Sequence, residues 1–126
     1  NVGIQTSSVV VRGLATGELG FHRTSRHLGR ELLTSLMTGV AVAGVLFLIA
    51  MLQSSLQSGS TESHFAAVLA LSMLLVILFA ALAGTGVPLL LHRLGVDPAV
   101  ATGPFITTAN DICGLLIYFG LAAQLL

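Results

Sequence analysis

The chain has 126 residues, of which 55% are hydrophobic and 8% are charged, and its formal net charge is zero. Soluble domains carry about 25% charged residues, so this chain cannot cover a water-facing surface with its own polar side chains. The composition therefore predicts an integral membrane protein rather than a soluble domain. The single cysteine, Cys113, excludes an intrachain disulfide and a cysteine-based metal site.

The first apolar segment, Val2 to Val11, is interrupted by several polar residues and is too short to span a membrane alone. We interpret it as the second half of a membrane helix. Two longer apolar segments follow, Leu32 to Leu52 and Phe65 to Leu91, and neither contains a charged residue. A spanning helix needs about 20 predominantly apolar residues, so both are predicted to cross the membrane. The second is longer than a bilayer requires, and we expect it to kink or end near Pro88.

The last apolar segment, Pro104 to Leu126, is also long enough to span. It begins with proline, whose missing N–H costs nothing in the first turn of a helix. One carboxylate, Asp111, lies near its middle. Placing an ionisable group in the hydrocarbon core of a membrane costs free energy, so Asp111 is expected to face a bundle interior or a water-filled cavity. The lengths of the three long segments exclude strands, so the predicted class is all-α.

All five arginines fall on one side of the predicted spans. Four lie between the opening segment and the first full span, and the fifth lies between the second and third spans. They are Arg12, Arg23, Arg26, Arg30 and Arg93. By the positive-inside rule that side is cytoplasmic. The sequence therefore predicts a multi-pass protein of the cell membrane, with residues 16–30 in the cytoplasm and with the loop from Gln53 to His64 and the C-terminus outside.

Polar or small residues share the helical face of Asp111. They are Thr107, Thr108, Gly114 and Tyr118. Carboxylate, hydroxyl and carbonyl oxygens suit a hard cation such as Mg²⁺. A two-fold dimer would bring two such carboxylates together and match the charge of a divalent ion. The alternative is that Asp111 pairs with an arginine or is protonated, although every arginine lies near a predicted membrane boundary.

Two parts of the chain, its opening residues and its last apolar segment, resemble the MgtE magnesium channels. From Asp97 to Tyr118 the chain has the pattern of that family's last pore helix, which is DPA, then proline, then TTxxDxxGLxxY. From Asn1 to Gln5 and from Arg12 to Glu18 it is similar to the family's GNxGNQ and RGLAxGE motifs. The motifs occur in the family's order and spacing. The chain departs from the family at Ile4 and Gly103, where many members have an asparagine that lines the cytosolic constriction.

The resemblance implies an all-α, polytopic transmembrane helix bundle whose pore lies at a homodimer interface. Residues 1–126 would be a partial pore domain, namely the end of helix 2 plus helices 3–5 of the family, without its first helix and cytosolic sensor domains. Asp111 matches the aspartate that binds the partly or fully hydrated ion, Thr107 matches a position whose backbone carbonyl lies near that ion, and Asp97 matches a charged residue at the cytosolic mouth. The other pore-lining positions that the resemblance implies are Asn1, Ile4, Gln5, Val100, Gly103, Thr108 and Gly114.

We therefore expect the pore domain of a magnesium-selective channel that conducts hydrated Mg²⁺, with other divalent cations as further candidates, and that works as a homodimer in membrane lipid. One mid-membrane carboxylate per protomer is too few strong ligands for a dehydrated cage, which favours recognition of the ion's hydration shell. Two alternatives stay open. One is a cation-coupled secondary transporter in which Asp111 takes up a proton or metal ion, and the other is a non-transporting assembly subunit. The chain has no nucleophile–base pair, phosphate-binding loop or basic aromatic face, so neither an enzyme nor a nucleic-acid-binding protein is expected.

Overall fold

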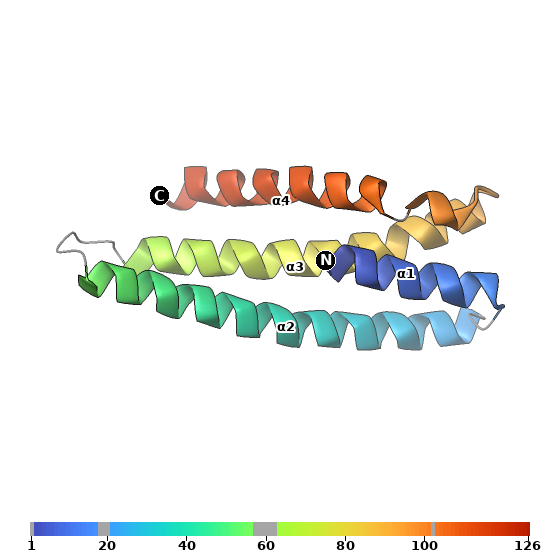
Figure 1. The fold of residues 1–126 in the computed structure, drawn as a ribbon, viewed down its shortest axis with the longest axis horizontal. Coiled ribbons are helices and arrows are strands. Elements are labelled where there is room, and N and C mark those ends of the chain that lie inside the picture. Colours follow the sequence, from blue (N-terminus) through green and yellow to red (C-terminus); the bar gives the residue numbers. More distant parts are fainter. Residues whose placement is uncertain (1, 18–20, 57–62, 102) are drawn as a thin grey trace.

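The computed structural model describes residues 2–17, 21–56, 63–101 and 103–126. These ranges form four α-helices and one 3₁₀-helix and contain no strand. The elements are α1 (Val2–Ala15), α2 (Phe21–Leu56), α3 (Ser63–Arg93), η1 (Pro98–Ala101) and α4 (Pro104–Leu125). The predicted all-α class is confirmed. Figure 1 shows α3 between two layers, with α4 on one side of it and α2 on the other.

Helix α1 is short and buries one face. Its buried residues recur with the spacing of a single helical face: Gly3, Thr6, Ser7 and Val10. At 1.5 Å per residue its 14 residues extend about 21 Å, which is less than the hydrocarbon thickness of about 30 Å. Helix α1 alone is therefore too short to cross the hydrocarbon layer. The described start of α1 lies beside the second half of α3, where Gly3 meets Gly84 (Figure 1).

Helices α2 and α3 form a long antiparallel pair (Figure 1). Small residues on α2 permit a close approach, as is common between membrane helices. Ser35, Gly39 and Ala43 are spaced four residues apart and are buried. A Cβ added at Gly39 would lie 2.8 Å from Leu74 Cδ1 of α3. Helix α2 is longer than the predicted span, because the polar stretch that precedes Leu32 continues the same helix from Phe21.

Helix α3 is the centre of the bundle and contacts α1, α2, η1 and α4. Of the two outcomes expected near Pro88, a kink or an end, the end does not occur, since the helix continues to Arg93. Proline removes one N–H from the helix and crowds the carbonyl four residues earlier. That carbonyl belongs to Gly84, and membrane helices tolerate the interruption where neighbouring helices pack against it. Both Pro88 and Gly84 are buried in this way.

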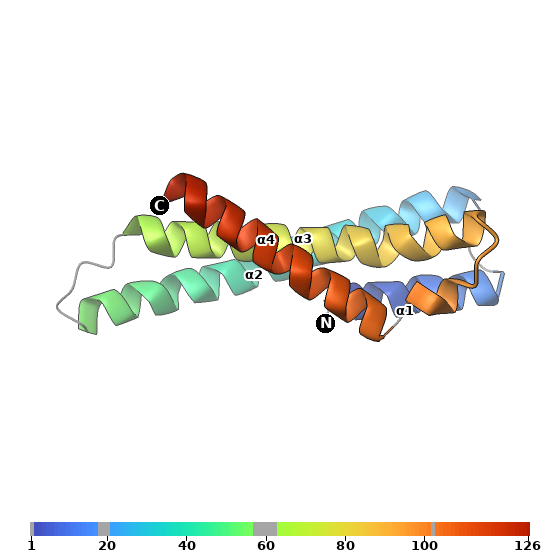
Figure 2. The same ribbon diagram turned by 90° about the horizontal axis from the view of Figure 1, so that it is seen from above.

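Three described helices are long and apolar enough to cross a membrane: Arg26–Leu56, Ser63–Arg93 and Pro104–Leu125. They contain the three predicted spans, and the chain is a multi-pass membrane protein. The helices differ in how far the protein covers them. Buried residues make up 33% of the most apolar stretch of α3 but only 6% of that of α4. Figure 2 shows the reason, because α4 crosses over α3 at an angle instead of following its length.

Candidate functional site

The turn that leads into α4 is built from local hydrogen bonds. Asp97 accepts a hydrogen bond at Oδ1 from the backbone N–H of Ala99, at 3.0 Å, which fixes the start of η1. Gly103 then takes φ 61° and ψ −127°, a conformation that side-chain-bearing residues rarely adopt. Pro104 follows in the first turn of α4. The chain therefore changes direction at Gly103, and α4 begins where the sequence predicts.

Thr107 is tied to this turn. Its backbone N–H and its hydroxyl both donate to the carbonyl oxygen of Gly103, at 3.1 Å and 3.0 Å. The Thr107 hydroxyl hydrogen is thus occupied, and the oxygen lone pairs are what the side chain can offer to a cation. Thr107 is exposed, so those lone pairs are accessible from outside the protomer.

Asp111 lies on an exposed face of α4, one turn beyond Thr107. The opposite side of the helix is anchored by Ile106, which is 1% exposed. Thr107, Thr108 and Asp111 are all exposed within a single protomer. The helix therefore presents two hydroxyls and a carboxylate outward while its apolar anchor faces the rest of the bundle.

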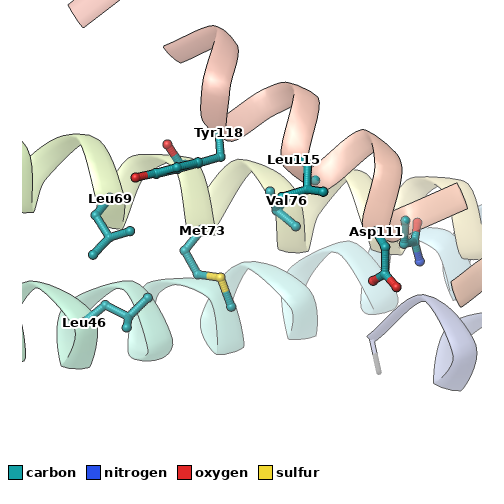
Figure 3. Close-up of a pocket in the computed structure, with 10 residues that line it drawn as sticks. Leu46, Leu69, Met73, Val76, Asp111, Leu115 and Tyr118 are labelled. Carbon is teal, nitrogen blue, oxygen red and sulfur yellow. The ribbon is translucent and has the colours of Figure 1, made fainter. Parts of the chain in front are cut away.

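A pocket of about 530 Å³ lies between α4 and the α2–α3 pair. It is lined by Leu46, Leu69, Ser72, Met73, Val76, Asn110, Asp111, Gly114, Leu115 and Tyr118. Figure 3 shows the Asp111 carboxylate at one end of this pocket and the Tyr118 ring at the other. The lining between them is mostly apolar, so Asp111 lies at the border between an apolar groove and the exposed face of α4.

Gly114 lies where α4 approaches α3. A Cβ added at Gly114 would be 3.3 Å from Cγ1 of Val76. That distance is tighter than ordinary van der Waals contact, so the absence of a side chain lets the two helices approach. Gly114 is half-buried and borders both the helix contact and the pocket.

The other predicted pore residues are spread over α1 and the turn before α4. Gln5 and Val100 are exposed, whereas Ile4 and Gly103 are half-buried. The structure brings the start of α1 next to the middle of α4, since a Cβ on Gly3 would collide with the side-chain amide nitrogen of Asn110. Asp97 is separate from this group, because it lies in the turn before η1. Asn1 lies outside the described residues.

Sequence reasoning missed the part that Asn110 plays in packing. Its amide lies against Gly3 of α1, and its Oδ1 is buried with no hydrogen-bond partner among the described residues. Gly3 also meets α3, because a Cβ on Gly84 would be 2.6 Å from the Gly3 carbonyl oxygen. The contacts of Gly3 therefore join α1, α3 and α4 directly beside Asp111.

A second missed contact links α1 to α2. The buried Thr6 hydroxyl donates to Oε2 of Glu31 at 3.3 Å. Glu31 is half-buried, so this carboxylate at the edge of a span has a partner inside the bundle. The only sequence signal was a carboxylate one residue before the apolar segment of α2.

A single protomer offers a cation few charged ligands. Within the described ranges, no group of three or more His, Cys, Asp or Glu residues is arranged to hold a metal ion. The other exposed oxygen-bearing side chains near Asp111 on α4 are Thr107 and Thr108, four and three residues earlier in the chain. Such a set suits a hard cation that keeps most of its water ligands.

Comparison with known proteins gives one consistent result. A family model named MgtE, divalent cation transporter, matches residues 1–121. The magnesium transporter MgtE of Bacillus subtilis is 43% identical over 122 residues, and that of Enterococcus faecalis is 40% identical over 126 residues. The magnesium transporter MgtE of Thermus thermophilus is 35% identical over 128 residues.

The matches cover 97%, 98% and 100% of this chain, respectively. The chain spans 26% of the length of each of these relatives. A family of transporters, not of enzymes, is thus matched across nearly the whole chain, which confirms the resemblance carried by the two motifs. The chain belongs to the MgtE family of divalent cation transporters.

Proposed function

We propose that this chain forms part of a magnesium-conducting pore at the interface of a homodimer, with Asp111 as the residue that attracts the ion. Three relatives named magnesium transporters support the choice of ion. The observation that carries the proposal is the exposure of Asp111 on a helix that is long and apolar enough to span a membrane.

An exposed carboxylate on a spanning helix cannot face lipid without a large cost. The described part of the protomer does not cover it, since Asp111 lies at the edge of the pocket and on the open side of α4. A second copy related by a two-fold axis would bring two Asp111 side chains together, and two carboxylates match the charge of Mg²⁺. Water would fill the space between them and remove the need to bury the charge in hydrocarbon.

The ion in this proposal stays largely hydrated. Mg²⁺ prefers octahedral oxygen ligands and gives up water reluctantly. Asp111, Thr107 and Thr108 supply one carboxylate and two hydroxyls per protomer on the exposed face. These groups fit a site that binds the water ligands of the ion. Asp97, just before η1, and Val100, within η1, would line the cytoplasmic mouth, with Gly114 and Gln5 along the pore.

We also propose that residues 16–30 and the turn before α4 are cytoplasmic. All five arginines lie in helices at that end: Arg12 is in the last turn of α1, Arg93 ends α3, and the other three are in the first third of α2. The C-terminus of α4 would then be extracytoplasmic, because α4 crosses once from that side.

The direct test is Mg²⁺ uptake by the Asp111→Asn variant in a magnesium-requiring bacterial strain. The amide keeps the shape of the side chain and removes its charge, so uptake is expected to fall to the level of cells without the protein. Cys113→Ser is the matched control, because the thiol lies two residues away and has no place in the proposed site. Both variants must be inserted in equal amounts, measured by immunoblot of membranes.

The outcome separates the proposed channel from the two alternatives. Single-channel currents in a planar bilayer that are lost in Asp111→Asn support a channel. Uptake that requires a counter-ion gradient would identify a coupled transporter, and undiminished uptake in Asp111→Asn would remove Asp111 from the pathway.

A further inference from the structure

Two arginines of α2 lie in line with its exposed apolar residues. Arg26 and Arg30 are both exposed and are one helical turn apart. Continuing along the same face at steps of three or four residues, every residue is apolar and exposed. These residues are Leu33, Met37, Val40, Gly44 and Leu48. We define Arg26, Arg30 and these five residues as the outer stripe of α2.

The dimensions of this face fit the hydrocarbon core of a bilayer and one headgroup layer. From Leu33 to the exposed Leu52, α2 rises about 28 Å at 1.5 Å per residue, close to a hydrocarbon thickness of about 30 Å. Arg30 and Arg26 lie about 4 Å and about 10 Å beyond Leu33 along the axis. The polar layer on each side of the hydrocarbon is about 5 to 7 Å thick. Flexible arginine side chains at both heights can reach it.

The charge on this surface is not neutralised by the rest of α2. Glu31 is the only acidic residue of that helix, and its carboxylate accepts a hydrogen bond from Thr6 on the side that faces α1. The nearby hydroxyl of Thr34 donates to the backbone carbonyl of Arg30, and no acidic side chain lies on the outer stripe itself. Two guanidinium groups therefore face outward with their donors available on the described surface.

We propose that the outer stripe of α2 binds an anionic phospholipid. The guanidinium groups of Arg26 and Arg30 would hold the lipid phosphate, since planar guanidinium groups bind phosphate oxygens in pairs. One acyl chain would lie along Leu33 and Met37. The occupant is a lipid and not free phosphate, because the phosphate-binding pair continues without a break into an apolar surface of acyl-chain length. The site is separate from Asp111 and does not depend on ion conduction.

The test uses the purified chain in detergent with mixed phosphatidylglycerol and phosphatidylcholine, and native mass spectrometry to count retained lipid. Wild-type protein is expected to retain phosphatidylglycerol in preference to phosphatidylcholine. Retention affinity should fall about fivefold for each arginine removed in Arg26→Gln and Arg30→Gln. The matched control is Arg12→Gln, which removes the same charge from an exposed position at the end of α1 and should retain lipid like the wild type.

Two further experiments distinguish a bound lipid from free phosphate and give a result that does not depend on how well the variants fold. Inorganic phosphate should not displace the bound lipid, and Leu33→Ser should weaken retention although both arginines are kept. In the wild-type protein, a photoactivatable phosphatidylglycerol should cross-link to residues 26–37. Equal retention in Arg12→Gln, Arg30→Gln and wild type, displacement by inorganic phosphate, or cross-links confined to other helices would each overturn the proposal.

Discussion

Helices α3 and α4 are both long and apolar enough to span a membrane. They differ in how much of each is buried against the rest of the protein. Helix α3 contacts every other described helix, whereas α4 rests mainly on α3 and buries a single residue, Ile106. The two buried hydroxyls of α3 are satisfied within the helix: those of Ser72 and Thr85 donate to carbonyls one turn earlier, at 2.7 Å and 3.0 Å.

Three polar side chains of α4 face outward, although Asn110 packs against α1. Thr107, Thr108 and Asp111 are exposed, and no neighbouring element of the described protomer covers them. A membrane helix in this state needs another protein surface or water beside it. The comparison teaches that α3 is the scaffold of the protomer. The polar face of α4, in contrast, needs a further protein surface or water that a single protomer does not supply.

The strongest effect is expected from filling the closest contact on α3. In Gly84→Leu the new Cβ would be 2.6 Å from the Gly3 carbonyl oxygen, so the backbones of α1 and α3 must separate. We expect a loss of stability of more than about 3 kcal/mol, beyond ordinary overpacking, seen as loss of monodisperse protein on heating in detergent.

The matched control is Gly86→Leu, two residues along the same helix. A Cβ at Gly86 meets no atom within 4 Å, so this variant should behave like the wild type. Equal thermal stability of the two leucine variants would contradict the role of α3 as a tightly packed scaffold.

A smaller effect is expected where α3 meets α4. In Gly114→Leu the Cβ would lie 3.3 Å from Val76 Cγ1, and Val76 is a side chain that can shift. We expect a loss of about 1–2 kcal/mol together with reduced Mg²⁺ uptake, because the leucine would fill part of the pocket beside Asp111. Gly120→Leu is the control, since a Cβ at Gly120 meets nothing within 4 Å. If Gly120→Leu lowers uptake as much as Gly114→Leu, the effect comes from surface bulk and not from the α3–α4 contact.

The smallest effect concerns the link between α1 and α2. Thr6→Val keeps the shape of the buried side chain but removes the donor to Glu31. We expect a loss of about 1 kcal/mol, typical of a hydrogen bond between membrane helices. Thr6→Ser keeps the hydroxyl and should lie closer to the wild type in the same thermal assay. A Thr6→Val protein as stable as Thr6→Ser would show that the bond contributes nothing.

The spans and the start of α4 could be predicted because their signals are local. Uninterrupted apolar runs set the spans, and Pro104 after a glycine sets the first turn of α4. The sequence left open whether α3 kinks or ends near Pro88, since the neighbouring helices that pack against the proline are not visible in a local pattern.

The candidate site was predicted only in part. Asp111 and Thr107 are polar residues on one face of an apolar helix, and both match positions of the family's motif. The packing of Gly3 against Asn110 and the bond from Thr6 to Glu31 join residues that are far apart in the chain. No periodicity marks such contacts, so they needed the three-dimensional arrangement.

The central claim is that the Asp111 face of α4 meets a second copy of the chain. The adjacent residues Leu115 and Leu116 allow a matched comparison, because both are well exposed, at 57% and 67%. Only Leu115 lies one turn from Asp111 on the same face of α4. Single cysteines at the two positions, each built on Cys113→Ser, are compared by disulfide cross-linking in native membranes. The account predicts a cross-linked dimer for Leu115→Cys and little for Leu116→Cys. Efficient cross-linking at Leu116 with none at Leu115 would contradict it.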